Sequence, residues 1–175
     1  MTNDLQRAID TLDSIVQDPS RGLPEDVFLL ISRMTPLVNV DLLIHDPARG
    51  YLLTWRDDAF FSPAWHIPGG IIRFRELAAQ RICEVARMEL GATVSFEPTP
   101  AMVYESIRPA PMSRGHFISL LYRCTLLTPP EPALQFVSGT PRARQWAWHA
   151  TCPENLTDVQ LPYAEFLVSA SGEPN

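Results

Sequence analysis

The sequence contains no lysine, because all fourteen of its basic residues are arginines. This absence excludes enzymes that form a Schiff base on a lysine and nucleotide-binding proteins that depend on a phosphate-loop lysine. Cysteine is also scarce, since Cys83, Cys124 and Cys152 are too few, odd in number and badly spaced for a disulfide framework or a zinc knuckle. Such cysteine usage is typical of a reducing compartment, and we expect a cytoplasmic location.

Long apolar runs and an excess of positive charge are missing as well. The first ten residues carry acids and no apolar core, so we expect neither a signal peptide nor a membrane anchor. The net charge is −6 and the pI about 5.1, which argues against a nucleic-acid partner. Any contact with phosphate must therefore come from a local cluster or from a metal. A chain of 175 residues is expected to build one domain.

The first 34 residues are predicted to form a helical extension. Apolar residues recur at helical spacing until "DPSRGLP" interrupts them: Leu5, Ile9, Leu12 and Val16. A second helix is expected from Pro24 to the residues before Pro36, where helix is disfavoured.

The remaining chain is predicted to be a domain of class α+β, spanning 35–168, with a flexible tail at 169–175. Runs rich in β-branched and aliphatic residues predict strands at 37–46, 51–56, 101–107, 116–127 and 144–150. A single long helical pattern lies between the second and third of these strands. A mixed sheet with that helix packed on it is the expected architecture.

The most informative segment is "WHIPGGIIRFRELAAQRICEVARMELG", from Trp65 to Gly91. It begins as a strand, turns at a glycine pair and continues as a helix. Glu76, Glu84 and Glu89 occupy polar positions of that helix. Two interpretations are open: a solvated helix face with ion pairs, or a divalent-metal site that handles phosphates. Glu84, flanked by Arg81 and Arg87, suits the first interpretation.

This segment resembles the Nudix box, whose general pattern is G-x5-E-x7-R-E-U-x-E-E-x-G-U with U aliphatic. Four residues fall in register: Gly70, Glu76, Glu89 and Gly91. Three others differ from the pattern, because Glu84 replaces its arginine and Val85 and Met88 replace two glutamates. The resemblance implies a Nudix fold and a hydrolase that uses a divalent metal.

The similarity extends to one branch of the family, the GDP-mannose mannosyl hydrolases, in which water attacks the sugar carbon. "SRMTPLVNVDLLIHD" and "GYLLTWR" are similar to the first two strands of that branch. The resemblance implies Mg²⁺, with Mn²⁺ as an alternative, and a nucleoside diphosphate sugar as substrate. It also implies a homodimer, which the amphipathic N-terminal helices would help to build.

Site residues follow from the same resemblance. Glu89 and the Gly70 carbonyl match metal ligands, and Glu76 supports the metal-binding turn. Asp41 matches an acid near the sugar, and Tyr104 matches a tyrosine near the phosphate. Two further positions differ from that branch. Arg142 stands where the branch has a glutamine metal ligand, and Ala143 stands where it has a histidine general base.

Physical chemistry supports part of this assignment. Mg²⁺ often needs only one or two carboxylates when substrate phosphates complete its shell, so Glu89 can suffice. Arginine neutralises a leaving diphosphate well, which favours Arg56 and then Arg142 as substrate-binding residues. Asp41 lies within an apolar strand, where a carboxylate without a partner is costly. Phe61, in the loop before the motif, is a candidate contact for a nucleobase.

Two questions stay open at this stage. His66, His116 and His149 are candidate general bases, but their positions on or after strands do not single one out. The leading function is a Mg²⁺-dependent hydrolase of a nucleoside diphosphate-linked compound. The alternative is a catalytically impaired Nudix-fold module that binds nucleotide sugars or has a regulatory role. Val85, Met88 and Ala143 favour this alternative.

Overall fold

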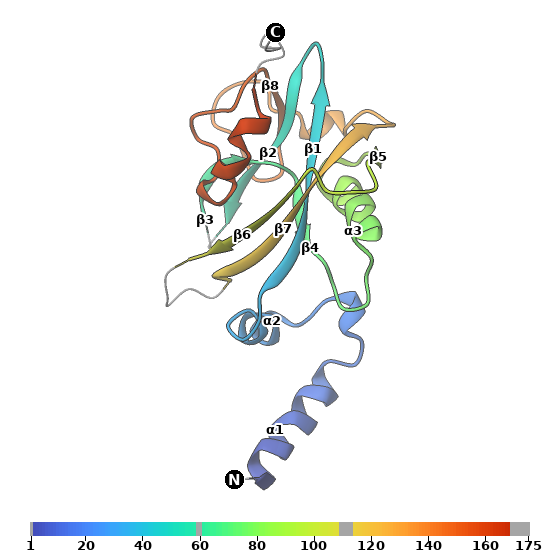
Figure 1. Cartoon of the computed structure of the whole chain (residues 1–175), viewed down its shortest axis with the longest axis vertical. Helices are drawn as coiled ribbons and strands as arrows, with labels where there is room; N and C mark the ends of the chain where they lie inside the picture. The colour runs from blue at the N-terminus through green and yellow to red at the C-terminus, as the bar shows by residue number, and fades with distance from the viewer. Residues whose placement is uncertain (1, 59–60, 109–113, 169–175) are drawn as a thin grey trace.

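The computed structural model describes residues 2–58, 61–108 and 114–168, and Figure 1 shows their arrangement. The strands are β1 Leu37–Asp46, β2 Gly50–Asp58, β3 Phe61–His66, β4 Gly69–Ile71, β5 Val94–Phe96, β6 Met102–Ile107, β7 His116–Leu126 and β8 Trp146–His149. The helices are α1 Thr2–Ile15, α2 Glu25–Ile31 and α3 Ala78–Val85, which continues as a π-helical turn over Ala86–Leu90. Short 3-10 turns cover Pro19–Arg21, Pro132–Leu134 and Asp158–Phe166.

Strand β1 is the centre of the mixed sheet. Its residues 37–44 pair in parallel with 117–124 of β7. On its other side, β1 pairs antiparallel with β4 near its start and with β2 at its end. The partner of β1 on this edge thus changes from β4 to β2 along the strand. Asp41 is the last residue of β1 that pairs with β4, and it lies opposite Gly69.

The two faces of β1 belong to two apolar clusters, because successive side chains of a strand point to opposite faces. Val40, Leu42 and Ile44 pack with Ile82 and Leu90 of the α3 region. Leu43 lies in the other cluster, which includes Leu53 and Tyr163. The segment Asp158–Phe166 thus covers the face opposite α3, and Asp41 points toward it.

The predicted α+β class is confirmed, and the long strands lie close to their predicted positions. Several short elements were not predicted, and the expected loop before the motif is wrong from Phe61 onward, where β3 begins. Strand β4 includes Gly69 and Gly70, where the glycine pair suggested only a turn, and β5 has three residues. The 3-10 segment Asp158–Phe166 contains Pro162, which obscures any helical pattern. The predicted tail, 169–175, lies outside the described residues.

Helix α1 extends away from the sheet (Figure 1). Its apolar residues Leu5 and Ile15 are 65% and 53% exposed, so the amphipathic face predicted from the sequence is not buried within this chain. Within the described part of the chain, none of the helices combines the length and apolar character needed to span a bilayer.

Candidate active site

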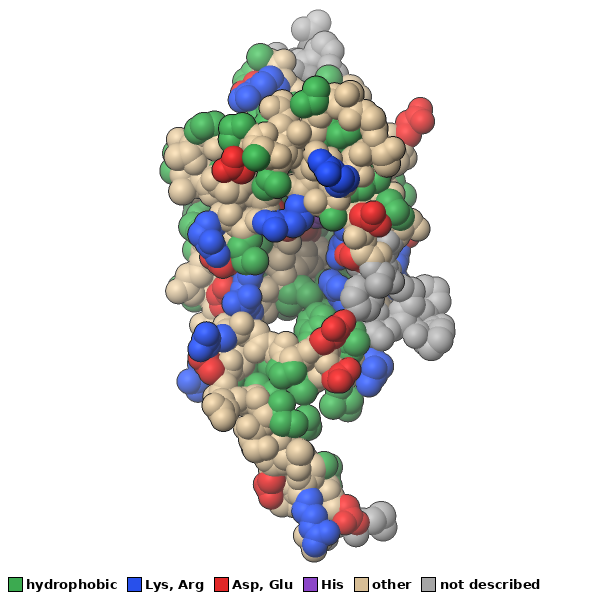
Figure 2. Space-filling view, turned by 180° about the vertical axis from the view of Figure 1, so that it is seen from behind, with side chains coloured by type: hydrophobic (Ala, Val, Ile, Leu, Met, Phe, Trp, Pro, Cys, Tyr) green, Lys and Arg blue, Asp and Glu red, His purple; other side chains and the backbone are tan. Residues whose placement is uncertain are grey.

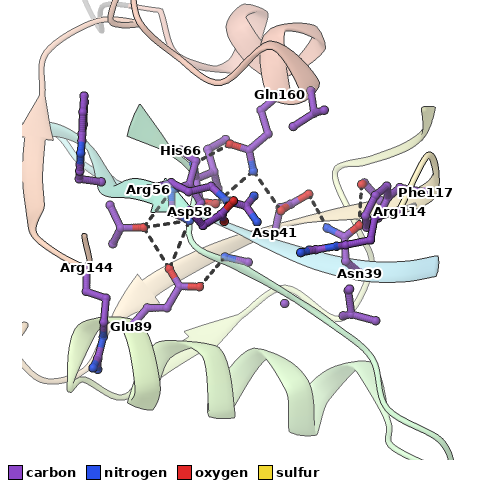
Figure 3. Close-up of a pocket in the computed structure, with 18 of the residues that line it drawn as sticks. Asn39, Asp41, Arg56, Asp58, His66, Glu89, Arg114, Phe117, Arg144 and Gln160 are labelled. Atoms are coloured by element: carbon purple, nitrogen blue, oxygen red, sulfur yellow. Dashed lines mark hydrogen bonds and ion pairs between the residues drawn. The ribbon is translucent and has the colours of Figure 1, made fainter. Parts of the chain in front are cut away.

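A cavity of about 570 Å³ opens beside the middle of β1. Its walls come from β1, β2, β6, β7, the β3–β4 connection, the end of the α3 region and the residues at 114, 143–144 and 159–160 (Figure 3). In the space-filling view, basic side chains gather around a hollow on the face turned away in Figure 1 (Figure 2). This size is in the range of pockets that hold small molecules.

Glu89 enters the cavity from the last turn of the α3 region (Figure 3). Its Oε2 accepts a hydrogen bond from Thr54 Oγ1 at 3.0 Å, and its Oε1 lies 3.4 Å from the backbone nitrogen of Gly69. The helix has widened to π geometry here and ends at Gly91, whose φ of 62° suits glycine. The carboxylate is therefore held beside the glycine pair, facing β2.

Asp41 forms part of the cavity wall although it is only 3% exposed. Its Oδ2 accepts from Tyr163 at 2.9 Å and from Asn39 at 3.0 Å, and its Oδ1 accepts from Gln160 at 3.1 Å. Burial raises the pKa of Asp41 to about 6, although these hydrogen bonds and the nearby His66 lower it. All three neighbours donate, which is the arrangement that an ionised carboxylate requires.

Gly69 is needed at this point for close packing. A Cβ added there would lie 2.3 Å from Asp41 Oδ1 and 2.9 Å from the Val40 carbonyl oxygen. The glycine pair thus lets β4 approach β1 and brings Gly70 into the cavity wall.

Three arginines line the cavity: Arg56, Arg114 and Arg144. Arg56 Nε donates to Asp58 Oδ2 at 2.5 Å. The pKa of Arg114 is lowered by burial and by the positive charge of Arg56, whereas Asp58 opposes that shift. Two guanidinium groups that feel each other's charge favour the binding of an anion between them.

Further contacts fix the other two arginines. Arg114 has a positive φ of 61°, its backbone nitrogen donates to Ser32 Oγ at 3.2 Å, and its guanidinium lies 5.6 Å from the Phe28 ring. The α2 region therefore supports the cavity. Arg144 Nη2 donates to the Met88 carbonyl at 2.9 Å, which fixes the helical turn that carries Glu89.

Four predicted site residues come together in this cavity: Asp41, Arg56, Gly70 and Glu89. Tyr104 and Arg142 are not among the described residues that line it. Tyr104 lies beside Tyr163, with the two ring centroids 6.3 Å apart. Arg142 is exposed, and its backbone nitrogen donates to Gln145 Oε1 at 2.8 Å. The side chain of Phe61 lies outside the described structure.

Glu76 also lies apart from the cavity lining. Its Oε2 accepts from the backbone nitrogen of Arg73 and from Arg81 Nε, both at 2.8 Å. It therefore closes the turn between β4 and α3, which suits a supporting part in the site. The expected ion pair between Glu84 and Arg87 is confirmed, at 2.7 Å. The expected pair between Glu84 and Arg81 is wrong, because Arg81 turns inward and pairs with Glu76.

Replacing Glu76 with glutamine should lower the free energy of unfolding by about 2 to 3 kcal/mol, because it leaves the buried Arg81 guanidinium without a counter-charge. The Arg81 and Glu76 side chains are only 7% and 15% exposed. Chemical denaturation measures the change. Glu84→Gln, in the exposed pair with Arg87, is the matched control and should leave the midpoint almost unchanged. Equal midpoints for the two variants would show that Glu76 does not stabilise the turn.

Sequence reasoning missed Tyr163, Gln160, Arg114 and Arg144. Tyr163 and Gln160 come from a segment with no periodic pattern, more than 115 residues from Asp41 in the chain. Arg114 follows a proline-rich stretch, and nothing local connects it with Arg56. Arg144 could have been suspected, since it lies two residues after Arg142 at the start of the predicted last strand.

The described residues contain no group of three or more histidine, cysteine, aspartate or glutamate side chains suited to a metal. A site for Mg²⁺ with a single carboxylate is nevertheless compatible with the cavity. Glu89 faces it, and Gly69 and Gly70 let the backbone come close to a ligand. The donor set fits a divalent cation whose remaining ligands are oxygens of a substrate or of water.

No family model matches the sequence. The chain is 29% identical over 111 residues to the low-salt glycan biosynthesis protein Agl8 of Haloferax volcanii, covering 62% of this chain and 70% of that protein.

Solved structures align with a larger share of this chain. A UDP-X diphosphatase aligns with a TM-score of 0.55 and 18% identity over 95% of this chain and 90% of its own. A MutT NUDIX hydrolase from Burkholderia pseudomallei has a TM-score of 0.54 and 23% identity, over 75% and 97%. A NUDIX hydrolase from Nitrosomonas europaea has a TM-score of 0.53 and 14% identity, over 78% and 82%. The predicted Nudix fold is confirmed: this chain has the fold of the Nudix hydrolases.

Proposed function

We propose that the protein is a hydrolase of a nucleoside diphosphate sugar, or of a related nucleoside diphosphate-linked compound, and that it depends on Mg²⁺ or Mn²⁺. The observation that carries this proposal is the shared cavity, whose lining brings together the carboxylates of Asp41 and Glu89 and three arginines. The names of Agl8, a glycan biosynthesis protein, and of the UDP-X diphosphatase support a substrate of this class.

Attack at the sugar carbon suits the distribution of charge in the cavity. Cleavage of a glycosyl bond develops positive charge on the sugar, which a nearby carboxylate stabilises. Asp41 is such a carboxylate, held by three neutral donors and away from bulk water. The leaving diphosphate gains negative charge, which Arg56 and Arg114 are placed to neutralise.

Glu89 and the Gly70 carbonyl would hold the divalent cation together with substrate oxygens. When bound, the cation supplies further positive charge toward the diphosphate. Attack at phosphorus normally uses the glutamates that Val85 and Met88 replace, and Met88 presents an apolar side chain to the cavity. Those substitutions support attack at carbon.

The alternative is a module that binds a nucleotide sugar without turnover. Val85, Met88 and Ala143 favour it because they replace groups that the related enzymes use. Incubating the purified protein with Mg²⁺ or Mn²⁺ and a panel of nucleotide sugars, including GDP-mannose, and of dinucleotides distinguishes the two. Release of a nucleoside diphosphate supports the hydrolase, whereas measurable binding without any product supports the module.

Metal binding should depend on the nucleotide. We expect weak binding of Mg²⁺ to the protein alone and tighter binding with a nucleoside diphosphate. The reason is that the phosphate oxygens complete the coordination shell of the cation that Glu89 binds. Calorimetry with and without GDP measures the coupling, and Glu84→Gln is the control for loss of a carboxylate outside the cavity. Tight Mg²⁺ binding that persists in Glu89→Gln without nucleotide would assign the cation to other ligands.

The exposed apolar face of α1 supports the predicted homodimer. Leu5, Ile9 and Ile15 are all more than 40% exposed in the single chain. Removing the residues before Gly22 should therefore shift the protein from dimer to monomer, while α2 and its contacts to Arg114 are retained. Light scattering at micromolar concentration tests this, and a monomeric full-length chain would contradict it.

A further inference from the structure

His66 is the one histidine among the described residues lining the cavity. Its side chain is 13% exposed, and its Nε2 lies 3.5 Å from Glu89 Oε2. Thr54 Oγ1 is close to both atoms, 3.2 Å from His66 Nε2 and 3.0 Å from Glu89 Oε2. Figure 3 shows both labelled side chains in the same cavity.

The fold fixes this pair from two directions. His66 ends β3 and lies opposite Thr54 of β2 in the sheet register. Glu89 comes from the π-helical turn, which Arg144 ties through the Met88 carbonyl. The Thr54 hydroxyl donates to the carboxylate, so it orients Glu89 toward the imidazole. A pair held by three separate elements is preorganised to share one ligand.

We propose that His66 Nε2 is the second side-chain ligand of the divalent cation bound by Glu89, a role that rests on the proposed function. Two metal–ligand bonds of about 2.1 Å each span up to about 4.2 Å, so one ion can contact both atoms at their observed separation. The imidazole binds through an unprotonated nitrogen, with its remaining proton on Nδ1.

This assignment explains how the metal site can work with Glu89 as its single carboxylate ligand. The side chains of Val85 and Met88 offer no oxygen or nitrogen ligand, and His66 supplies a nitrogen from the strand that precedes the glycine pair. Nitrogen ligands favour first-row transition ions over Mg²⁺, which prefers an all-oxygen shell. The site should therefore bind Mn²⁺ more tightly than Mg²⁺.

Pulsed electron paramagnetic resonance of Mn²⁺ bound with GDP tests the ligand directly, without turnover. We expect a nitrogen coupling from a histidine in the wild-type protein and its loss in His66→Gln. Calorimetry should show that His66→Gln weakens Mn²⁺ binding on the order of tenfold or more and changes Mg²⁺ binding less. Circular dichroism confirms that the variant is folded.

A matched control is available in His116, which forms an exposed pair with Glu105 at 2.9 Å on β7 and β6. His116→Gln should leave both the coupling and the affinity unchanged. A nitrogen coupling that persists in His66→Gln, or Mn²⁺ binding that is unaffected by it, overturns the assignment. If Glu89→Gln alone abolishes binding, the metal site of the proposed function stands without His66. If neither variant changes binding, that metal site fails as well.

Discussion

Replacing Asp41 with asparagine should reduce the release of free sugar from a nucleotide sugar by roughly a thousandfold. The substitution keeps the size of the side chain but removes the negative charge that the positively charged sugar requires. It also places an NH2 group among Tyr163, Asn39 and Gln160, all of which donate to the present carboxylate. We expect the loss mainly in kcat, because the charge matters most in the transition state.

The matched control is Asp46→Asn, at the far end of the same strand. Asp46 pairs with Arg49 at 2.7 Å on the surface and is not among the described residues that line the cavity. Its variant should retain full turnover. If Asp41→Asn and Asp46→Asn are equally active, Asp41 has no part in the chemistry.

The pH dependence provides a second test of Asp41. Burial raises the pKa of this carboxyl to about 6, so turnover that needs its ionised form should fall as the pH drops through 6. The folded state holds the proton more tightly than the unfolded state, in which the pKa is near 3.8. Stability from this group is therefore lost as pH rises from about 4 to about 6, by up to about 3 kcal/mol. The free energy of unfolding of Asp41→Asn should therefore not show this decrease between about pH 4 and pH 6.

Arg56→Ala should lower kcat/KM by about a hundredfold to a thousandfold, because it removes a positive charge placed against the leaving diphosphate. Arg56→Lys should recover only part of the activity, since an ammonium cannot present two parallel donors. Steady-state kinetics with the best substrate of the panel measures both. Arg87→Ala, in the exposed pair with Glu84, is the control and should match the wild type. Equal rates for Arg56→Ala and Arg87→Ala would remove Arg56 from the site.

The long strands and the central helix could be predicted from the sequence because their patterns are local. Periodic apolar residues marked β1 and α3, and the glycine pair with Glu89 marked one wall of the cavity. Asp41 stood out because a carboxylate inside an apolar strand needs a partner. These signals were sufficient for the fold and for part of the site.

The partners of those residues could not be predicted in the same way. Tyr163 and Gln160 reach Asp41 from the far end of the chain, through a 3-10 segment without a repeating pattern. Arg114 is held at a positive φ by the Ser32 hydroxyl and lies over the Phe28 ring, contacts that no local spacing encodes. The preference of Arg81 for Glu76 over Glu84 depends on which neighbour is buried.

Hydrolysis in water enriched in oxygen-18 tests most directly whether this cavity cleaves the glycosyl bond at carbon. A nucleotide sugar that the panel identifies as a substrate is incubated with the protein and Mn²⁺ or Mg²⁺, and the products are resolved by mass spectrometry. We expect an unlabelled nucleoside diphosphate and a free sugar that carries the label. Label on a phosphate, with either a nucleoside monophosphate or a nucleoside diphosphate as product, would contradict attack at the sugar carbon.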